Sequence, residues 1–220
     1  MAQTLDLEEQ EQLDQLKHFW RRYGNLITLT LTLVFGGVAA WNGWQFWQHR
    51  QAVAAAALFD ELERAVADRE TERVQRVLSD LQNGYGRTAY ATQGALLAAR
   101  GWFAAGQAAP AQSALEWVVA QSSDEGLVAV SRLRLAALAL ERGAPQEAAT
   151  WLDKAHPAAF KGLFADRKGD VHLALNQRAE AKAAFLEAHA QLDARSEYRR
   201  LVEVKLEQLG VDPQSLNERK

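Results

Sequence analysis

The pattern of hydrophobic and polar positions begins with one long apolar run. Residues 23–48 contain no Asp, Glu, Lys, Arg or His. A helix of about 20 apolar residues crosses the ~30 Å hydrocarbon layer of a bilayer, and this run is long enough. Three tryptophans at its end, Trp41, Trp44 and Trp47, are typical of the aromatic belt at a membrane–water interface. The pattern predicts a transmembrane helix over 24–47, with these tryptophans as its anchors in the lipid bilayer.

Two alternatives remain open for the same run. The first is a buried core helix, although core helices are seldom free of charge over so many residues. The second is a cleaved signal peptide, for which Gly37, Val38 and Ala39 offer a small-x-small cleavage site. An acidic segment precedes the run and Trp41 follows it closely, and neither feature is typical of a signal peptide.

The charges on either side of the run predict its orientation. Lys17, Arg21 and Arg22 directly precede it, whereas Arg50 is the only basic residue close behind it. Basic flanks stay in the cytoplasm. We therefore expect residues 1–23 to form a short cytoplasmic tail. The remaining residues, 48–220, would lie across the membrane, which in a bacterial inner membrane is the periplasm.

Behind the run, apolar positions recur at helical spacing and fall into pairs of segments separated by short turns. The expected helix pairs are 51–67 with 70–81, 88–105 with 110–121, 126–142 with 145–154, and 162–175 with 178–192, followed by a last helix over 197–209.

Small residues recur within these helices with a period near 34, as expected where two helices touch. In the first helices of the last three pairs they are Ala99, Ala136 and Gly169. In the second helices of the same pairs they are Ser113, Ala148 and Ala181. We predict these six as helix-packing positions.

Two further series keep a similar spacing. Large partners follow the small positions of the first helices at Phe103, Leu140 and Leu173. Residue types that tolerate the left-handed conformation then end those helices at Gly106, Gly143 and Asn176. This is a degenerate tetratricopeptide pattern, with a plain helical bundle as the alternative. The sequence therefore predicts an all-α fold, in which one N-terminal transmembrane helix precedes a tetratricopeptide-like α-solenoid of about four helix pairs plus a C-terminal helix.

Composition narrows the possible functions. The 25 Lys and Arg against 28 Asp and Glu give a net charge of −3, so nothing indicates a nucleic-acid partner. The absence of cysteine excludes a disulfide framework, a thiolate zinc site, an iron–sulfur cluster and a cysteine nucleophile. We expect no cofactor.

No motif points to catalysis. Residues 84–89 match G-x-G-x-x-A, but a dinucleotide site needs a strand before this motif, so we interpret it as a turn between helices. Asp166 and Asp170 stand one helical turn apart near His172. We interpret these carboxylates as surface ion pairs with Arg167 and Lys168 rather than metal ligands. The sequence therefore does not predict an enzyme.

A binding surface is the remaining possibility. Stacked helix pairs offer an extended surface to peptides or partner domains. The aromatic candidates for lining it, or for packing in the core instead, are Trp102, Trp117, Trp151, Phe160 and Phe164.

The order of these parts resembles a known family. The acidic tail, the Trp-flanked run and an alanine-rich region are followed by SSDEGLVAVSRLRLA (Ser122–Ala136) and ADRKGDVHLALNQRAEAKAAF (Ala165–Phe185). Together they resemble the YfgM family, the ancillary subunits of the SecYEG translocon.

The resemblance implies an inner-membrane protein with a periplasmic tetratricopeptide-like domain. It also implies association with the translocon and with a membrane-anchored periplasmic peptidyl-prolyl isomerase, and delivery of translocated proteins to periplasmic chaperones. No catalytic residue, cofactor or metal follows from it. The alternative function is a structural scaffold subunit in another cell-envelope complex.

A reporter fusion tests the predicted topology. Alkaline phosphatase fused after Lys220 is expected to be active, because it acquires its disulfides outside the cytoplasm, whereas β-galactosidase fused there is expected to be inactive. Sequencing the N-terminus of the mature protein provides the second measurement. A mature chain that begins near Ala40 would contradict the uncleaved anchor.

Overall fold

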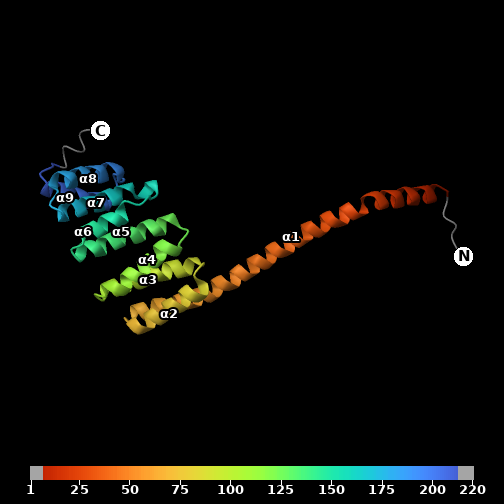
Figure 1. The fold of residues 1–220 in the computed structure, drawn as a ribbon, viewed down its shortest axis with the longest axis horizontal. Coiled ribbons are helices and arrows are strands. Elements are labelled where there is room, and N and C mark those ends of the chain that lie inside the picture. The colour runs from red at the N-terminus through yellow and green to blue at the C-terminus, as the bar shows by residue number, and fades with distance from the viewer. Residues whose placement is uncertain (1–6, 213–220) are drawn as a thin grey trace. The chain divides into compact units, whose positions relative to one another are not determined.

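The computed structural model describes residues 7–212, which form helices joined by short turns and contain no strand (Figure 1). The first part of the predicted tail, residues 1–6, lies outside the described residues. The helices are α1 (Leu7–Ala67), α2 (Thr71–Tyr85), α3 (Ala89–Ala104), α4 (Ala108–Gln121), α5 (Glu125–Glu141), α6 (Pro145–Leu152), α7 (Lys161–Ala174), α8 (Arg178–Gln191) and α9 (Glu197–Gln208), with a short 3₁₀ helix, η1 (Ala158–Phe160), before α7.

The observed helices match the predicted ones closely from α2 onward. The difference lies in α1, which contains both the expected transmembrane helix and the expected helix 51–67. The residues that connect them, 48–50, include no proline, glycine or capping residue, so nothing in the local sequence ends the helix there. The chain forms two compact units that divide within α1, after Val53.

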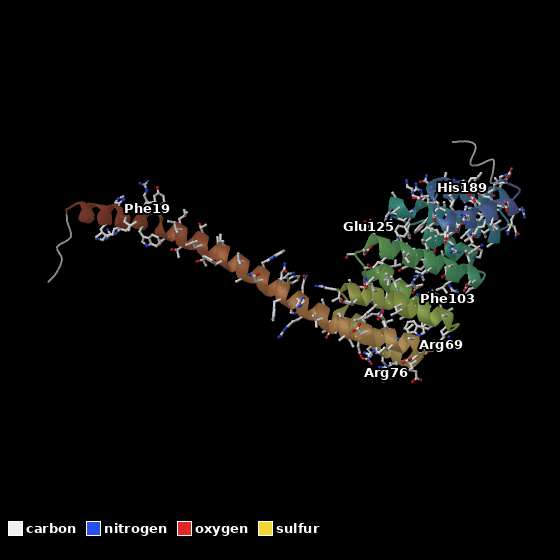
Figure 2. The ribbon with its side chains drawn as sticks, turned by 180° about the vertical axis from the view of Figure 1, so that it is seen from behind. Phe19, Arg69, Arg76, Phe103, Glu125 and His189 are labelled. Carbon is white, nitrogen blue, oxygen red and sulfur yellow. The ribbon has the colours of Figure 1, made fainter. Side chains whose placement is uncertain are left out.

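In the first unit, the element that the structure describes is α1, and the large apolar side chains from Leu29 to Val38 are exposed (Figure 2). Its threonines bond to their own helix: Thr28 Oγ1 donates to the carbonyl of Gly24 at 2.7 Å, and Thr32 Oγ1 to that of Thr28 at 2.8 Å. These hydroxyls are therefore satisfied without water.

In the second unit, the end of α1 and helices α2 to α9 follow one another as a stack of antiparallel helices (Figure 1). The end of α1 packs with α2 and α3, since Ala55, Leu62 and Ala65 are fully buried in the same apolar cluster as α2 and α3 residues. Two further clusters follow, one around Phe164 and one around Phe185. The core is thus a series of adjoining clusters along the stack, as in repeat proteins.

The first helix of each pair ends in the same left-handed turn. Gly106 has φ 72°, its N–H donates to Phe103 at 3.0 Å, and the N–H of Gln107 donates to Trp102 at 2.8 Å. This is the Schellman arrangement. Gly143 and Asn176 repeat it with φ 73° and 60°, which confirms the prediction for all three residues.

Two further helices end in the same way. Arg69 follows α1 with φ 59°, and Gly210 follows α9 with φ 77°. The second helices α4 and α8 instead end at residues in extended conformation, Ser122 and Leu192. The other second helices, α2 and α6, end at Gly86 and Asp153 in right-handed helical conformation, so among the described helices the left-handed end is confined to the first helices and α9.

The predicted small positions of the first helices are buried. Ala99 is 2% exposed, Ala136 is fully buried, and Gly169 is also buried. A Cβ built on Gly169 would lie 2.6 Å from Cδ1 of Phe185, closer than real contacts allow. In the second helices Ala148 and Ala181 are fully buried.

The prediction for Ser113 is wrong. Ser113 is exposed, and its hydroxyl bonds to the carbonyl of Ala109 in its own helix. The buried small residue is Ala111. Ala148 follows it after 37 residues and Ala181 follows Ala148 after 33, the same spacings as in the first helices. Two residues along a helix turn the side chain by about 200°, so Ser113 lies on the opposite face.

Gly169→Ala tests the close helix contact. The added methyl group must displace the buried ring of Phe185, and overpacking of this kind costs about 1–3 kcal/mol. The better helix propensity of alanine offsets up to about 1 kcal/mol of that cost. We expect a lower thermal midpoint of the full chain in detergent.

Gly84→Ala is the matched control. Gly84 is also helical, but nothing lies within 4 Å of an added Cβ. This variant is expected to unfold at the same temperature as the wild type or higher. Equal midpoints for the two variants would contradict the close contact at Gly169.

Candidate binding surfaces

The first candidate surface is the apolar part of α1. This helix is long and apolar enough to cross a membrane, and only 6% of its most apolar window is buried. Leu33 and Phe35 are each 68% exposed. A soluble protein seldom leaves so large an apolar surface in water, and this helix fits a membrane anchor.

The three predicted anchor residues lie together at the end of the apolar part. Trp41, Trp44 and Trp47 are all at least half exposed, and the rings of Trp44 and Trp47 lie 5.6 Å apart. Arg50 lies 4.9 Å above the ring of Phe46. Aromatic rings next to a cation suit the interface between lipid and water. Their role as anchors stays a prediction.

The five aromatic candidates of the second unit are mostly part of its core. Trp102 and Phe164 are 3% and 1% exposed, and the ring of Phe164 is stacked on that of His156 at 3.9 Å. Trp117, Trp151 and Phe160 are half-buried and pack against the same clusters. None of them is an exposed contact residue.

Among the described residues of the second unit, the large exposed aromatic residue is instead Phe103, at the end of α3 (Figure 2). The spacing predicted Phe103 as a large packing residue like Leu140 and Leu173, which are half-buried. Phe103 is 47% exposed and borders a pocket of about 330 Å³ between α3, α4 and α5. Arg100 and Arg134 border the same pocket. These two arginines had no signal in the sequence, because nothing in the local pattern shows that α3 and α5 bring their charges together.

The sequence predicted surface ion pairs for Asp166 and Asp170. Asp170 is half-buried and does pair with Arg167, but Lys168 pairs with Asp153 instead. Asp166 is fully buried in α7. Its oxygens accept bonds from Lys205 Nζ of α9 at 2.8 and 3.0 Å and from Tyr198 Oη at 2.6 Å. Lys205 Nζ also contacts Asp170 at 2.7 Å, and Arg167 contacts Asp170 at 3.1 Å. The network joins α9 to α7 and is structural.

Burial perturbs the titration of this network. Loss of hydration raises the pKa of the Asp170 carboxyl above its ordinary value, although Lys205 opposes the rise. Burial and the bond to Asp166 also raise the pKa of the Tyr198 hydroxyl. Tyr198 and Lys205 had no signal in the sequence, since they lie 32 and 39 residues from Asp166.

The remaining chemical motifs have structural roles in the described part of the chain. Gly86 is the C-cap of α2 and Thr88 the N-cap of α3, so the glycine motif at residues 84–89 spans the junction between two helices, as predicted. His172 Nδ1 lies 2.7 Å from Oε1 of Gln177. Within residues 7–212 no group of three or more His, Asp or Glu side chains is arranged to hold a metal ion.

An apolar N-terminal helix that fits a membrane anchor, followed by stacked helix pairs with recurring left-handed ends, defines a membrane-associated tetratricopeptide-like repeat protein. The family model of the tetratricopeptide repeat-like domain matches residues 17–211. No solved structure shows significant similarity to the chain.

Similarity to curated relatives shows which family of tetratricopeptide-like proteins the chain resembles. Over 207 residues, the chain is 31% identical to the ancillary SecYEG translocon subunit of Neisseria gonorrhoeae, covering 92% of this chain and 98% of the relative. Proteins of the same name match from Haemophilus influenzae, at 29% identity over 83% of this chain and 89% of the relative, and from Escherichia coli, at 24% over 92% and 97%. The chain belongs to the family of ancillary SecYEG translocon subunits.

Lys205→Met tests the buried network. It leaves the carboxylate of Asp166 without its cation, and removing one partner of a buried ion pair costs about 3–5 kcal/mol. Lys205 also opposes the rise in the pKa of the Asp170 carboxyl, so without Lys205 that pKa rises further. The folded state then binds more protons than the unfolded state, so the variant loses stability as the pH rises.

The destabilisation by Lys205→Met is therefore expected to be larger at pH 7 than at pH 4, measured as the thermal midpoint of the full chain in detergent. Lys168→Met is the control, because Lys168 and its partner Asp153 are 40% and 71% exposed in their side chains. Its effect is expected to stay below about 1 kcal/mol at both pH values. A pH-independent loss in Lys205→Met would contradict the network.

Proposed function

We propose that the chain is a single-pass inner-membrane protein that acts as a non-enzymatic adaptor at the SecYEG translocon. One observation carries the proposal: similarity to proteins named ancillary SecYEG translocon subunit extends over both the apolar helix and the repeat domain. A relative that shared only the repeats would support a fold, whereas similarity over both parts also supports a shared location and role.

In this proposal residues 1–23 form a short cytoplasmic tail, 24–47 the transmembrane helix, and 48–220 a periplasmic tetratricopeptide-like domain. The excess of basic residues before the span supports this orientation. A domain held at the membrane meets a membrane-embedded channel at a raised effective concentration, which favours an adaptor over a freely diffusing binding protein.

The proposed adaptor helps to deliver translocated proteins to periplasmic chaperones, with a membrane-anchored periplasmic peptidyl-prolyl isomerase as its second partner. The family resemblance of the sequence supports both statements. Stacked helix pairs offer an extended surface, and such surfaces bind peptides and partner domains. The alternative is a scaffold subunit in another cell-envelope complex, which would have the same fold.

Site-specific photocrosslinking in intact membranes separates these two functions. We expect benzoylphenylalanine in place of Phe35, which is 68% exposed, to form covalent adducts with a channel subunit. The same group in place of Leu62, which is fully buried, is the control and is expected to give none. Adducts with subunits of a different envelope complex, and none with the channel, would favour the scaffold.

A second variant tests whether the channel recognises the transmembrane span itself. Replacing residues 24–47 by an unrelated span of equal length and orientation is expected to reduce the yield of channel subunits that copurify with the protein. The small residues at Gly36 and Gly43 support this expectation, because an added Cβ at either would meet open space that a neighbouring membrane helix can fill. Undiminished yield would mean that the span only tethers the domain.

A further inference from the structure

The pocket between α3, α4 and α5 combines an apolar floor with a cationic rim. Its floor includes Ala99, Ala111, Leu115 and Leu138, all at most 4% exposed. Its volume of about 330 Å³ lies at the lower end of the range for ligand sites, roughly 300–1,000 Å³. A space of this size suits one or two apolar side chains.

Small residues keep this pocket open. Ala99 of α3, Ala111 of α4 and Ala137 of α5 line it together, and none has a side chain long enough to fill it. The next first helices along the stack, α5 and α7, pack directly against each other, whereas α3 and α5 make at most weak contact. The interval between α3 and α5 is therefore an opening in the stack.

The rim carries two positive charges that are not neutralised within the described part of the chain. Some arginines of this unit have carboxylate partners: Arg73 pairs with Glu61, and Arg142 with Glu147. Arg100 and Arg134 have none among residues 7–212, and the one hydrogen bond of Arg134 is a long one of 3.4 Å to the carbonyl of Leu96.

The two rim arginines also influence each other. Partial burial lowers the pKa of the Arg134 guanidinium below its ordinary value, and the positive charge of Arg100 lowers it further. Two like charges held close together favour an anion between them. Guanidinium groups bind carboxylates with paired, charge-assisted hydrogen bonds, and each has five N–H donors.

Phe103 completes the site. Its side chain is 47% exposed, and it follows Arg100 by one helical turn of α3. Leu140 and Leu173, at the same position in the later repeats, are half-buried. Exposed aromatic residues and arginines around an apolar pocket are the residue types that contribute most to protein recognition.

We propose that this pocket binds an extended segment of a partner polypeptide that carries apolar side chains beside carboxylates. The apolar side chains enter between Ala99, Ala111 and Ala137, and a carboxylate binds between Arg100 and Arg134. The inference rests on the proposed adaptor function, for which it names one binding site and the chemistry of its ligand. Acidic side chains and a terminal carboxylate share this chemistry.

Fluorescence anisotropy with the full chain in nanodiscs of neutral lipid tests the proposal. The probe is the labelled, amidated peptide GSGLELDGSG. Its two matched peptides are GSGLQLNGSG, which lacks carboxylates, and GSGSESDGSG, which lacks apolar side chains. We expect the probe to bind at least about tenfold more tightly than either matched peptide, because only the probe uses both the floor and the rim.

The double variant Arg100→Gln with Arg134→Gln is expected to weaken binding of the probe by about tenfold or more. The control is Arg76→Gln with Arg87→Gln, which removes the same charge from exposed positions outside the pocket (Arg76 is labelled in Figure 2). It is expected to leave the affinity within about twofold. Equal losses in both variants would indicate a general attraction between charges and would overturn the proposal.

Ala137→Leu tests the floor, because it fills the pocket without changing a charge. We expect it to weaken binding of the probe but to leave GSGSESDGSG unaffected. If this variant fails to fold, as judged by its thermal midpoint, the arginine variants still decide the result, since their side chains make no ion pair within residues 7–212 that folding needs. Probe binding that both the arginine and the floor variants leave unchanged would overturn the proposal.

The crosslinking experiment at Phe35 separates this proposal from the proposed function. If the arginine variant keeps its channel adducts and loses the peptide, both proposals stand. If the wild type forms channel adducts but does not distinguish the three peptides, the pocket proposal fails alone. If the peptides are distinguished through the pocket but no channel adduct forms, the translocon role fails and the pocket remains a peptide site.

Discussion

Close contact between helices at positions with almost no side chain is the interaction on which the repeat domain depends. At Gly169 the ring of Phe185 fills the space that a Cβ would occupy, so α7 and α8 approach until backbone and ring touch. Ala136 and Ala148 play the same part in the preceding pair, with Leu152 fully buried beside them. Each pair presents the next one with an apolar face, and the core extends along the stack without a single centre.

The ends of the helices set the direction of that stack. Left-handed residues such as Gly106 and Asn176 turn the chain sharply after a first helix, and the bonds around them satisfy carbonyl groups that the helix end leaves free. After α4 and α8 the chain instead leaves in extended conformation. The left-handed turn thus recurs after each first helix, although the sequences of these turns share few residues.

Most polar and apolar groups of the repeat domain have partners within the fold. In the described part of the chain, two surfaces have no such partner. The apolar face of α1 has no protein around it, and the rim arginines Arg100 and Arg134 have no carboxylate. The contrast with Lys205 is informative, because that cation is held by two carboxylates and lies over the ring of Phe185 at 5.1 Å. Lys205 serves the fold and is paired, and we propose that the unpaired Arg100 and Arg134 serve a ligand.

The sequence by itself determined the helices, their left-handed ends at Gly106, Gly143 and Asn176, and the apolar run of α1, because helix periodicity, turn residues and hydrophobic length act over neighbouring residues. Only the tertiary structure decided that Asp166 is buried, that Ser113 faces away from the contact filled by Ala111, and that Phe103 stays open beside two arginines. The partners of Asp166 lie more than 30 residues away on α9, and the pocket needs three helices to exist. Burial and charge pairing depend on which distant segments meet, and that is a property of the packed fold rather than of any local pattern.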